Sequence, residues 1–114
     1  FHSSLMKEAG EKLAMELNTI KFSPLQIPVV SNVTGIATKN SDEIKKLLSL
    51  QIFNPVEWVK SINYIANQGI NTFIEIGPGK VLNGLCSKIV KEAKIYNIEK
   101  FIDLEKITIM IDKN

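Results

Sequence analysis

The junction over residues 71–89 constrains the fold of this chain most strongly. Residues 71–76, which are typical of a strand, end abruptly in a Gly-Pro-Gly-Lys turn at 77–80, after which apolar residues recur at a helical spacing. Glycine permits the backbone angles of such a turn, so a strand followed at once by a helix is predicted. Open α/β sheets are built from this kind of junction. The helix is expected to bury one face, formed by Val81, Leu82, Leu85 and Ile89.

The residues before this junction predict two helices and a short strand. Ser3 or Ser4 can cap a first helix, and Ser41 can cap a second helix that ends near Gln51. Between them, residues 28–35 are typical of a short strand that runs into a turn. The buried stripe of the first helix is expected to comprise Leu5, Ala9, Leu13 and Leu17.

Two further helices and a further strand are predicted in the rest of the chain. Asn54-Pro55 followed by Glu57 has the form of a helix start, and Gly69 suits the left-handed end of that helix. Residues 94–98 are typical of a strand. Asp103 can cap a last helix, although residues 107–111 are also β-rich and a helix is only the preferred interpretation. The alternation predicts an α/β fold, with part of a parallel sheet wound with helices on both faces.

The amino-acid composition argues against several classes of binding partner. The chain carries 14 basic residues, all lysine, and 12 acidic residues, and their interspersed arrangement does not indicate a nucleic-acid surface. One cysteine and one histidine suggest neither a disulfide framework nor a metal site, so a cytoplasmic location is expected. No apolar run approaches the roughly 20 residues of a membrane span. We therefore expect no nucleic-acid, membrane or metal partner.

His2 is the first candidate for chemistry, because an imidazole exchanges protons near neutral pH. It precedes a helix, where a loop can present it at a site. A partner nucleophile is not evident: Ser3 is adjacent in sequence, and Cys86 fits a small buried residue better than a reactive thiol. The turn at 77–80 resembles a phosphate cradle, but it lacks the longer glycine-lysine-hydroxyl pattern, and a structural turn is preferred. For Ser31-Asn32 an ordinary turn is likewise preferred.

Four motifs occur together in register. They are Phe-His-Ser-Ser-Leu-Met at 1–6, Pro-Val-Val-Ser-Asn at 28–32, Gln-Ile-Phe-Asn-Pro-Val-Glu-Trp at 51–58 and Glu-Ile-Gly-Pro-Gly-Lys-Val-Leu at 75–82. In this order and spacing they closely resemble the C-terminal third of bacterial malonyl-CoA:acyl-carrier-protein transacylases. The resemblance extends from Phe1 to about Ile89.

The resemblance implies an acyltransferase of fatty acid biosynthesis that moves malonyl from coenzyme A to the phosphopantetheine thiol of acyl carrier protein through a seryl ester. His2 matches the catalytic histidine, and Gln51 matches the residue whose main-chain carbonyl accepts a hydrogen bond from the imidazole. Coenzyme A enters as a substrate thioester and no cofactor is implied. The Phe-His pair resembles the malonyl-selecting form of the motif.

The resemblance also implies that residues 1–114 form the C-terminal segment of the large acyltransferase subdomain. The nucleophile elbow, the malonyl-binding arginine and the small ferredoxin-like subdomain of the family have no counterpart in these residues. We therefore expect the remainder of the same transacylase chain to be a partner, and the segment to be inactive alone. Two alternatives stay open: an acyltransferase domain of a polyketide synthase, and a non-catalytic phosphate-binding, CoA-binding or interaction domain.

Overall fold

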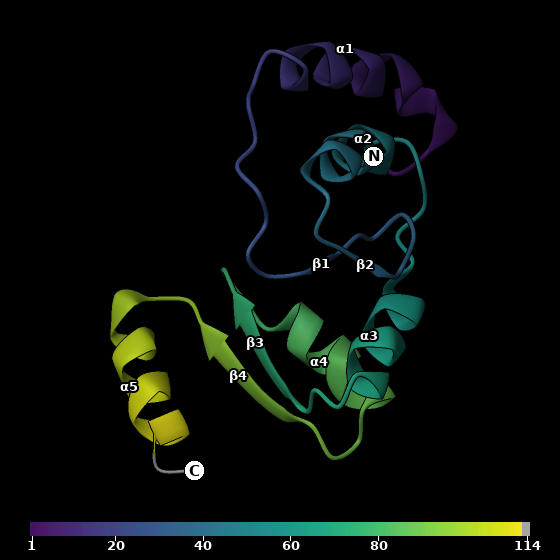
Figure 1. The fold of residues 1–114 in the computed structure, drawn as a ribbon. Coiled ribbons are helices and arrows are strands. Elements are labelled where there is room, and N and C mark those ends of the chain that lie inside the picture. Colours follow the sequence, from purple (N-terminus) through teal and green to yellow (C-terminus); the bar gives the residue numbers. More distant parts are fainter. Residues whose placement is uncertain (113–114) are drawn as a thin grey trace. The chain divides into compact units, whose positions relative to one another are not determined.

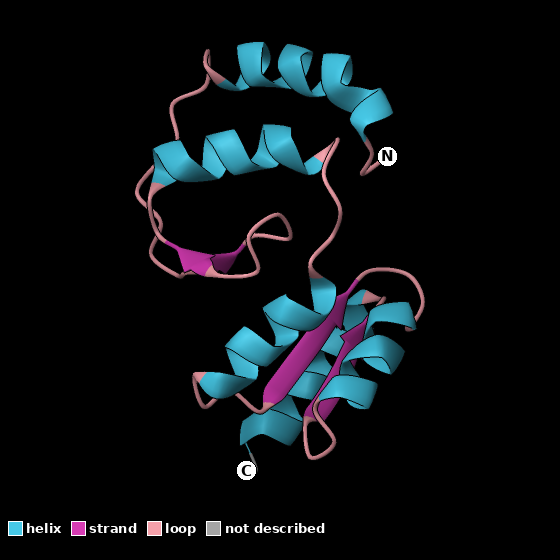
Figure 2. Ribbon diagram, turned by 90° about the vertical axis from the view of Figure 1, so that its right-hand side faces the viewer, coloured by secondary structure: helices cyan, strands magenta, loops and turns pink. Residues whose placement is uncertain are grey.

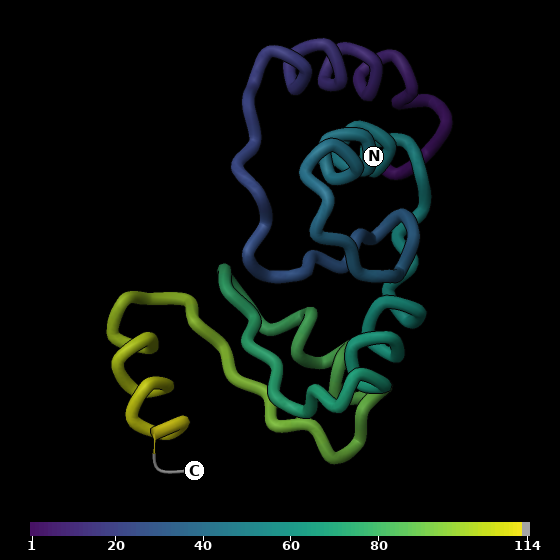
Figure 3. The backbone as a smooth tube through the Cα atoms, viewed as in Figure 1, coloured from purple at the N-terminus to yellow at the C-terminus, as the bar shows by residue number. Residues whose placement is uncertain are grey.

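The computed structural model describes residues 1–112, which fall into two compact units, Phe1–Tyr64 and the residues from Ile65 onward. Figure 1 shows the order of the elements and Figure 3 the path of the backbone. In the first unit the elements are η1 (Ser4–Met6), α1 (Lys7–Leu17), β1 (Val29–Val30), β2 (Ala37–Thr38) and α2 (Ser41–Gln51). Helix α3 (Trp58–Asn67) begins in the first unit and ends in the second.

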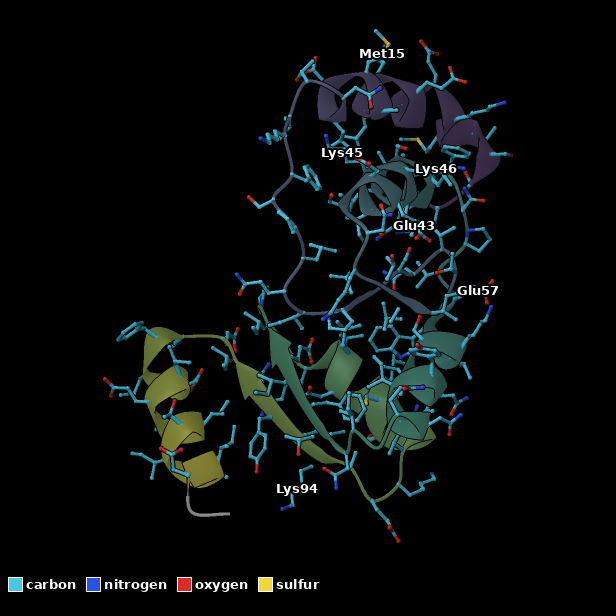
Figure 4. The ribbon with its side chains drawn as sticks, viewed as in Figure 1. Met15, Glu43, Lys45, Lys46, Glu57 and Lys94 are labelled. Carbon is cyan, nitrogen blue, oxygen red and sulfur yellow. The ribbon has the colours of Figure 1, made fainter. Side chains whose placement is uncertain are left out.

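Helices α1 and α2 pack against each other in the first unit, and a glycine lets them approach closely. A Cβ atom at Gly10 of α1 would lie 2.5 Å from the Phe53 ring and 2.9 Å from the Ser49 carbonyl oxygen. Ile44 and Leu47 are the buried apolar residues of α2. On β2, the Thr38 hydroxyl donates a hydrogen bond of 2.9 Å to the carboxylate of Glu43, which Figure 4 labels on α2.

The predicted strand at 28–35 is present as β1, but it is only two residues long. It pairs antiparallel with β2, which the sequence patterns did not predict. The polar residues between the strands form an ordinary turn, as expected: the Ser31 hydroxyl accepts from Val33 N–H at 3.1 Å, and the Ser31 carbonyl accepts from Gly35 N–H at 2.8 Å.

The second unit contains β3 (Thr72–Ile76), α4 (Val81–Ile89), β4 (Lys94–Ile98) and α5 (Phe101–Asp112). Strands β3 and β4 pair in parallel from Thr72↔Lys94 to Ile76↔Ile98. Helix α4 connects them, and α4 and α5 lie on opposite faces of the two strands (Figures 1 and 2). The predicted α/β arrangement, with a parallel sheet and helices on both faces, is therefore confirmed.

The starts of the first three helices differ from the sequence expectations. The cap of α2 is Asn40, whose side-chain oxygen accepts from Glu43 N–H at 2.9 Å, and not Ser41. At the first helix, Ser3 makes no side-chain capping bond. The helix predicted to start at Asn54-Pro55 begins only at Trp58; the Glu57 N–H donates to the Asn32 carbonyl oxygen at 2.7 Å, and the Glu57 carbonyl oxygen accepts from Ser61 N–H at 3.0 Å.

Several apolar residues that were predicted to be buried are exposed in the structure. Leu5, expected in the buried stripe of the first helix, is 92% exposed, and Val81 on α4 is 73% exposed. Leu82 and Leu85 are also exposed. Among residues 1–112 the parallel sheet has two strands, too narrow a surface to cover the whole apolar face of α4.

Candidate functional site

His2 is fixed at the C-terminal end of α2. Its imidazole Nδ1 lies 2.8 Å from the Gln51 carbonyl oxygen, and its backbone N–H donates to the Ile52 carbonyl oxygen at 2.7 Å. Figures 2 and 3 show the N-terminal segment meeting this end of α2. The structure thus contains the expected contact between His2 and Gln51, whereas the catalytic roles of both residues stay predictions.

The fold explains why carbonyl groups are available there. The last carbonyl groups of an α-helix have no partner within the helix, and α2 ends at Gln51. The ring of His2 satisfies the Gln51 carbonyl group, and its backbone N–H satisfies that of Ile52, the residue after the helix. To do so His2 adopts φ +61°, a left-handed conformation that is uncommon for a residue other than glycine. Neither the bond to Ile52 nor this conformation was predicted, because local sequence patterns carry no signal for contacts between distant segments.

This geometry determines what the imidazole can do. A ring whose Nδ1–H donates to a carbonyl oxygen carries its proton on Nδ1, which leaves Nε2 as an acceptor. Nε2 can then remove a proton from a hydroxyl or thiol group and later return it. The arrangement is that of a histidine base oriented by a carbonyl group in place of a carboxylate.

An open, mainly apolar groove of about 330 Å³ lies beside the imidazole. Apart from His2 and Gln51, its lining comes from the apolar residues Phe1, Leu13, Leu17, Leu48 and Ile52. The Phe1 side chain is 88% exposed. Such a surface can accept an apolar portion of a substrate or of another polypeptide segment, next to a proton acceptor.

The glycine turn at 77–80 is held by groups of the protein itself. Gly77 and Gly79 have φ values of +140° and +80°, so both need the conformational freedom of glycine. The Glu75 carboxylate accepts from Leu82 and Asn83 N–H at 3.4 and 2.9 Å, at the N-terminal end of α4. A second carboxylate, of Glu99, accepts from Gly79 N–H at 3.4 Å. Two carboxylates occupy and surround the amides that a phosphate would use, which supports the structural interpretation of this turn.

Cys86 shows no feature of a nucleophile. It is 3% exposed within α4, and burial raises the pKa of its thiol. The thiolate is the reactive form, so such an environment suppresses reactivity. Over residues 1–112, no group of three or more His, Cys, Asp and Glu side chains could hold a metal ion, and no helix has the length and apolar character to cross a membrane.

Comparisons with known proteins show extensive similarity. The chain is 48% identical over 89 residues to the malonyl CoA-acyl carrier protein transacylase of Escherichia coli strain K12. The aligned residues make up 78% of this chain and 29% of that protein. The crystal structure of malonyl CoA-acyl carrier protein transacylase from Clostridium perfringens matches 99% of this chain and 36% of its own, with 41% identity and a TM-score of 0.88.

A second similar structure includes a carrier protein. It is a type II PKS acyl-carrier protein in complex with its malonyl-transacylase. The match covers 92% of this chain and 34% of the matched chain, with 37% identity and a TM-score of 0.84. No protein-family model matches the chain. The chain thus spans about a third of the length of the proteins it resembles, corresponding to their C-terminal portion.

Proposed function

We infer that this chain is a C-terminal portion of a malonyl-CoA:acyl-carrier-protein transacylase, and we propose that it supplies the proton-transfer residue of such an enzyme. The complete protein transfers malonyl from malonyl-CoA to the phosphopantetheine thiol of acyl carrier protein in fatty acid biosynthesis. Residues 1–114 form the C-terminal segment of its large acyltransferase subdomain, and the rest of the same chain completes the site. We retain the cytoplasmic location expected from composition as part of the proposal.

The observation that carries this proposal is the pair of bonds that hold His2 on α2. Because Nδ1 faces the Gln51 carbonyl oxygen, Nε2 is the atom that accepts and returns protons. In the first half-reaction Nε2 takes the proton of a serine hydroxyl group elsewhere in the protein while the oxygen attacks the malonyl thioester carbon. The C–S bond breaks, and the coenzyme A thiolate receives the proton, leaving malonyl as a seryl ester.

The second half-reaction reverses the direction of acyl movement. Nε2 takes the proton of the phosphopantetheine thiol, and the thiolate attacks the seryl ester. The C–O bond breaks, the serine oxygen recovers its proton from the imidazolium, and malonyl leaves on the carrier protein. His2 thus serves as base and acid in turn, while Gln51 orients it through a main-chain atom.

A transfer assay with the complete protein tests this proposal. Purified protein is mixed with radiolabelled malonyl-CoA and holo acyl carrier protein, and labelled carrier protein is measured by gel. We expect malonyl transfer, with a lower rate from methylmalonyl-CoA. The same assay with the isolated 114-residue chain is expected to show no transfer, because these residues supply neither the nucleophile elbow nor an arginine. Absence of malonyl transfer by the complete protein, or transfer by the isolated chain, would contradict the proposal.

A further inference from the structure

The end of α2 presents three consecutive carbonyl groups, each with a partner from outside the regular helix. The Leu50 carbonyl oxygen accepts from the Asn54 side-chain amide at 2.7 Å. The next two, of Gln51 and Ile52, accept from the ring and the backbone of His2 at 2.8 and 2.7 Å. Asn54 and His2 therefore bind neighbouring carbonyl groups of the same turn.

We propose that Asn54 is a positioning residue for His2, acting through this turn; the inference rests on the proposed function of His2. No side-chain contact between Asn54 and His2 is involved. Asn54 fixes the Leu50 carbonyl group, and thereby sets the direction of the two carbonyl groups that hold the imidazole.

The Asn54 amide adds a short bond to a carbonyl group that the backbone also reaches. Ile52 and Phe53 N–H donate to the Leu50 carbonyl oxygen, the latter at 3.3 Å, which is long for a hydrogen bond, whereas the Asn54 amide donates at 2.7 Å. Pro55 contributes as well, because it restricts Asn54 to extended backbone. The helix therefore cannot continue through Asn54, and the side chain returns four residues to Leu50.

The conformation of His2 depends strongly on this turn. Its left-handed backbone, at φ +61°, is unfavourable on its own and persists because the surrounding structure holds it. The two bonds to Gln51 and Ile52 are its described anchors on α2. When the turn moves, the Nδ1–H bond weakens, and the ring samples the tautomer whose Nε2 carries the proton and cannot act as a base.

Asn40 supplies a matched control. It also flanks α2 and its side chain bonds a backbone group of that helix, but at the opposite end, where its oxygen accepts from Glu43 N–H at 2.9 Å. Replacing either asparagine by alanine removes one terminal hydrogen bond from the same helix. Only Asn54 lies next to the carbonyl groups that hold His2, so only its replacement is expected to alter the imidazole.

The experiment compares Asn54→Ala, Asn40→Ala and His2→Ala in the complete enzyme. Malonyl transfer gives kcat and KM, and ¹⁵N NMR of the histidine-labelled enzyme, with the His2 signals assigned by their absence from His2→Ala, gives the tautomer of the ring. For Asn54→Ala we expect kcat to fall about 10- to 100-fold with little change in KM for malonyl-CoA. The ring nitrogen signals should move toward a mixture of tautomers. For Asn40→Ala we expect kcat within about twofold of the parent value and an unchanged ring spectrum, although its Tm should fall by about as much as that of Asn54→Ala.

Asn54→Asp extends the test in case the alanine variant folds poorly. Aspartate has the shape of asparagine but, when ionised, has no proton to donate to the Leu50 carbonyl oxygen. The same change in kcat and ring spectrum is expected. An unchanged His2 spectrum and kcat in the Asn54 variants, or equal effects in Asn40→Ala, would overturn the inference. Full activity in His2→Ala would instead overturn the proposed function, and the spectrum of the Asn54 variants distinguishes the two failures because it does not depend on activity.

Discussion

Asp103 is a side chain whose ionisation the fold perturbs. Its carboxylate, in the first turn of α5, accepts from the backbone N–H groups of Lys100 and Glu99 at 2.9 and 3.1 Å. These two bonds, that of Lys100 first, hold the pKa of the Asp103 carboxyl below its ordinary value of 3.8, and the charges of Lys106 and Lys100 act in the same direction. The ionised carboxylate therefore stabilises the start of α5.

This lowered pKa predicts a pH dependence with a definite sign. The stabilisation is complete above the unfolded-state value, near 3.8, and is lost as the pH falls through the lower folded-state value. The variant Asp103→Asn lacks the carboxylate and therefore its pH-dependent contribution to the free energy of unfolding. The parent protein should be more stable than this variant near neutral pH, and the difference should shrink in acid. A ¹³C NMR titration of the Asp103 carboxyl measures the pKa directly. A midpoint at or above 3.8 would show that the backbone bonds do not act as described.

The roles of single polar residues were the least predictable part of the sequence. Asn40 and Ser41 are adjacent and both can cap a helix, so the sequence could not decide between them. Asn54 is typical of a residue that caps the start of a helix, yet its side-chain amide donates to the Leu50 carbonyl oxygen at the end of the preceding helix. Asp103 was expected before the last helix, but α5 begins at Phe101 and Asp103 binds back from within the first turn. In each case the partner is set by backbone geometry that residue type alone does not specify.

At the scale of elements, Gly69 illustrates how a helix ends. Helix α3 stops at Asn67, Gln68 and Gly69 donate to the Ile65 and Ala66 carbonyl oxygens, and Gly69 has φ +87°, as the sequence predicted. A Cβ atom there would meet no other group within 4 Å, so the cost of a substitution is purely conformational. The position therefore isolates the effect of a left-handed backbone.

We expect Gly69→Ala to lower the free energy of unfolding by about 1–2 kcal/mol. Gly69→Asn should cost less, because asparagine tolerates the left-handed region better than alanine. Urea unfolding of the complete protein measures both values. Equal stability of the parent and the alanine variant would mean that the backbone at Gly69 relaxes freely.

The long elements were predictable and the short ones were not. The strands β3 and β4 and the helix between them occur where the apolar patterns placed them, because each has a run of residues long enough to show its period. The last helix, preferred over a strand at 107–111, is also present as α5. Strand β2 has two residues, too few for any period, and the contact of His2 with Gln51 joins segments 49 residues apart. The sequence resemblance, and not a local pattern, predicted that contact.

At the scale of the whole molecule, apolar exposure is the main feature. Within β3, Ile74 and Ile76 are 41% and 79% exposed, although strands of parallel sheets are normally covered on both faces. On α5, Phe101 is 79% exposed. The chain spans 29% of the length of its Escherichia coli relative. We therefore expect the remainder of the enzyme to cover much of this surface.

The isolated 114-residue chain should consequently bind an apolar dye such as ANS and self-associate. The complete protein should bind much less dye per mole and sediment as a defined species. Fluorescence titration and analytical ultracentrifugation of the two proteins, at equal molar concentrations, provide the comparison. Weak dye binding by a monomeric isolated chain would indicate that these residues cover their own apolar surface.

The kinetics of His2→Ala in the complete enzyme test most directly whether His2 transfers the protons during malonyl transfer. Removing a general base is expected to reduce kcat for malonyl transfer by about 10²- to 10⁴-fold while the enzyme remains folded by circular dichroism. A folded His2→Ala enzyme that transfers malonyl to acyl carrier protein at nearly the parental rate would contradict the account.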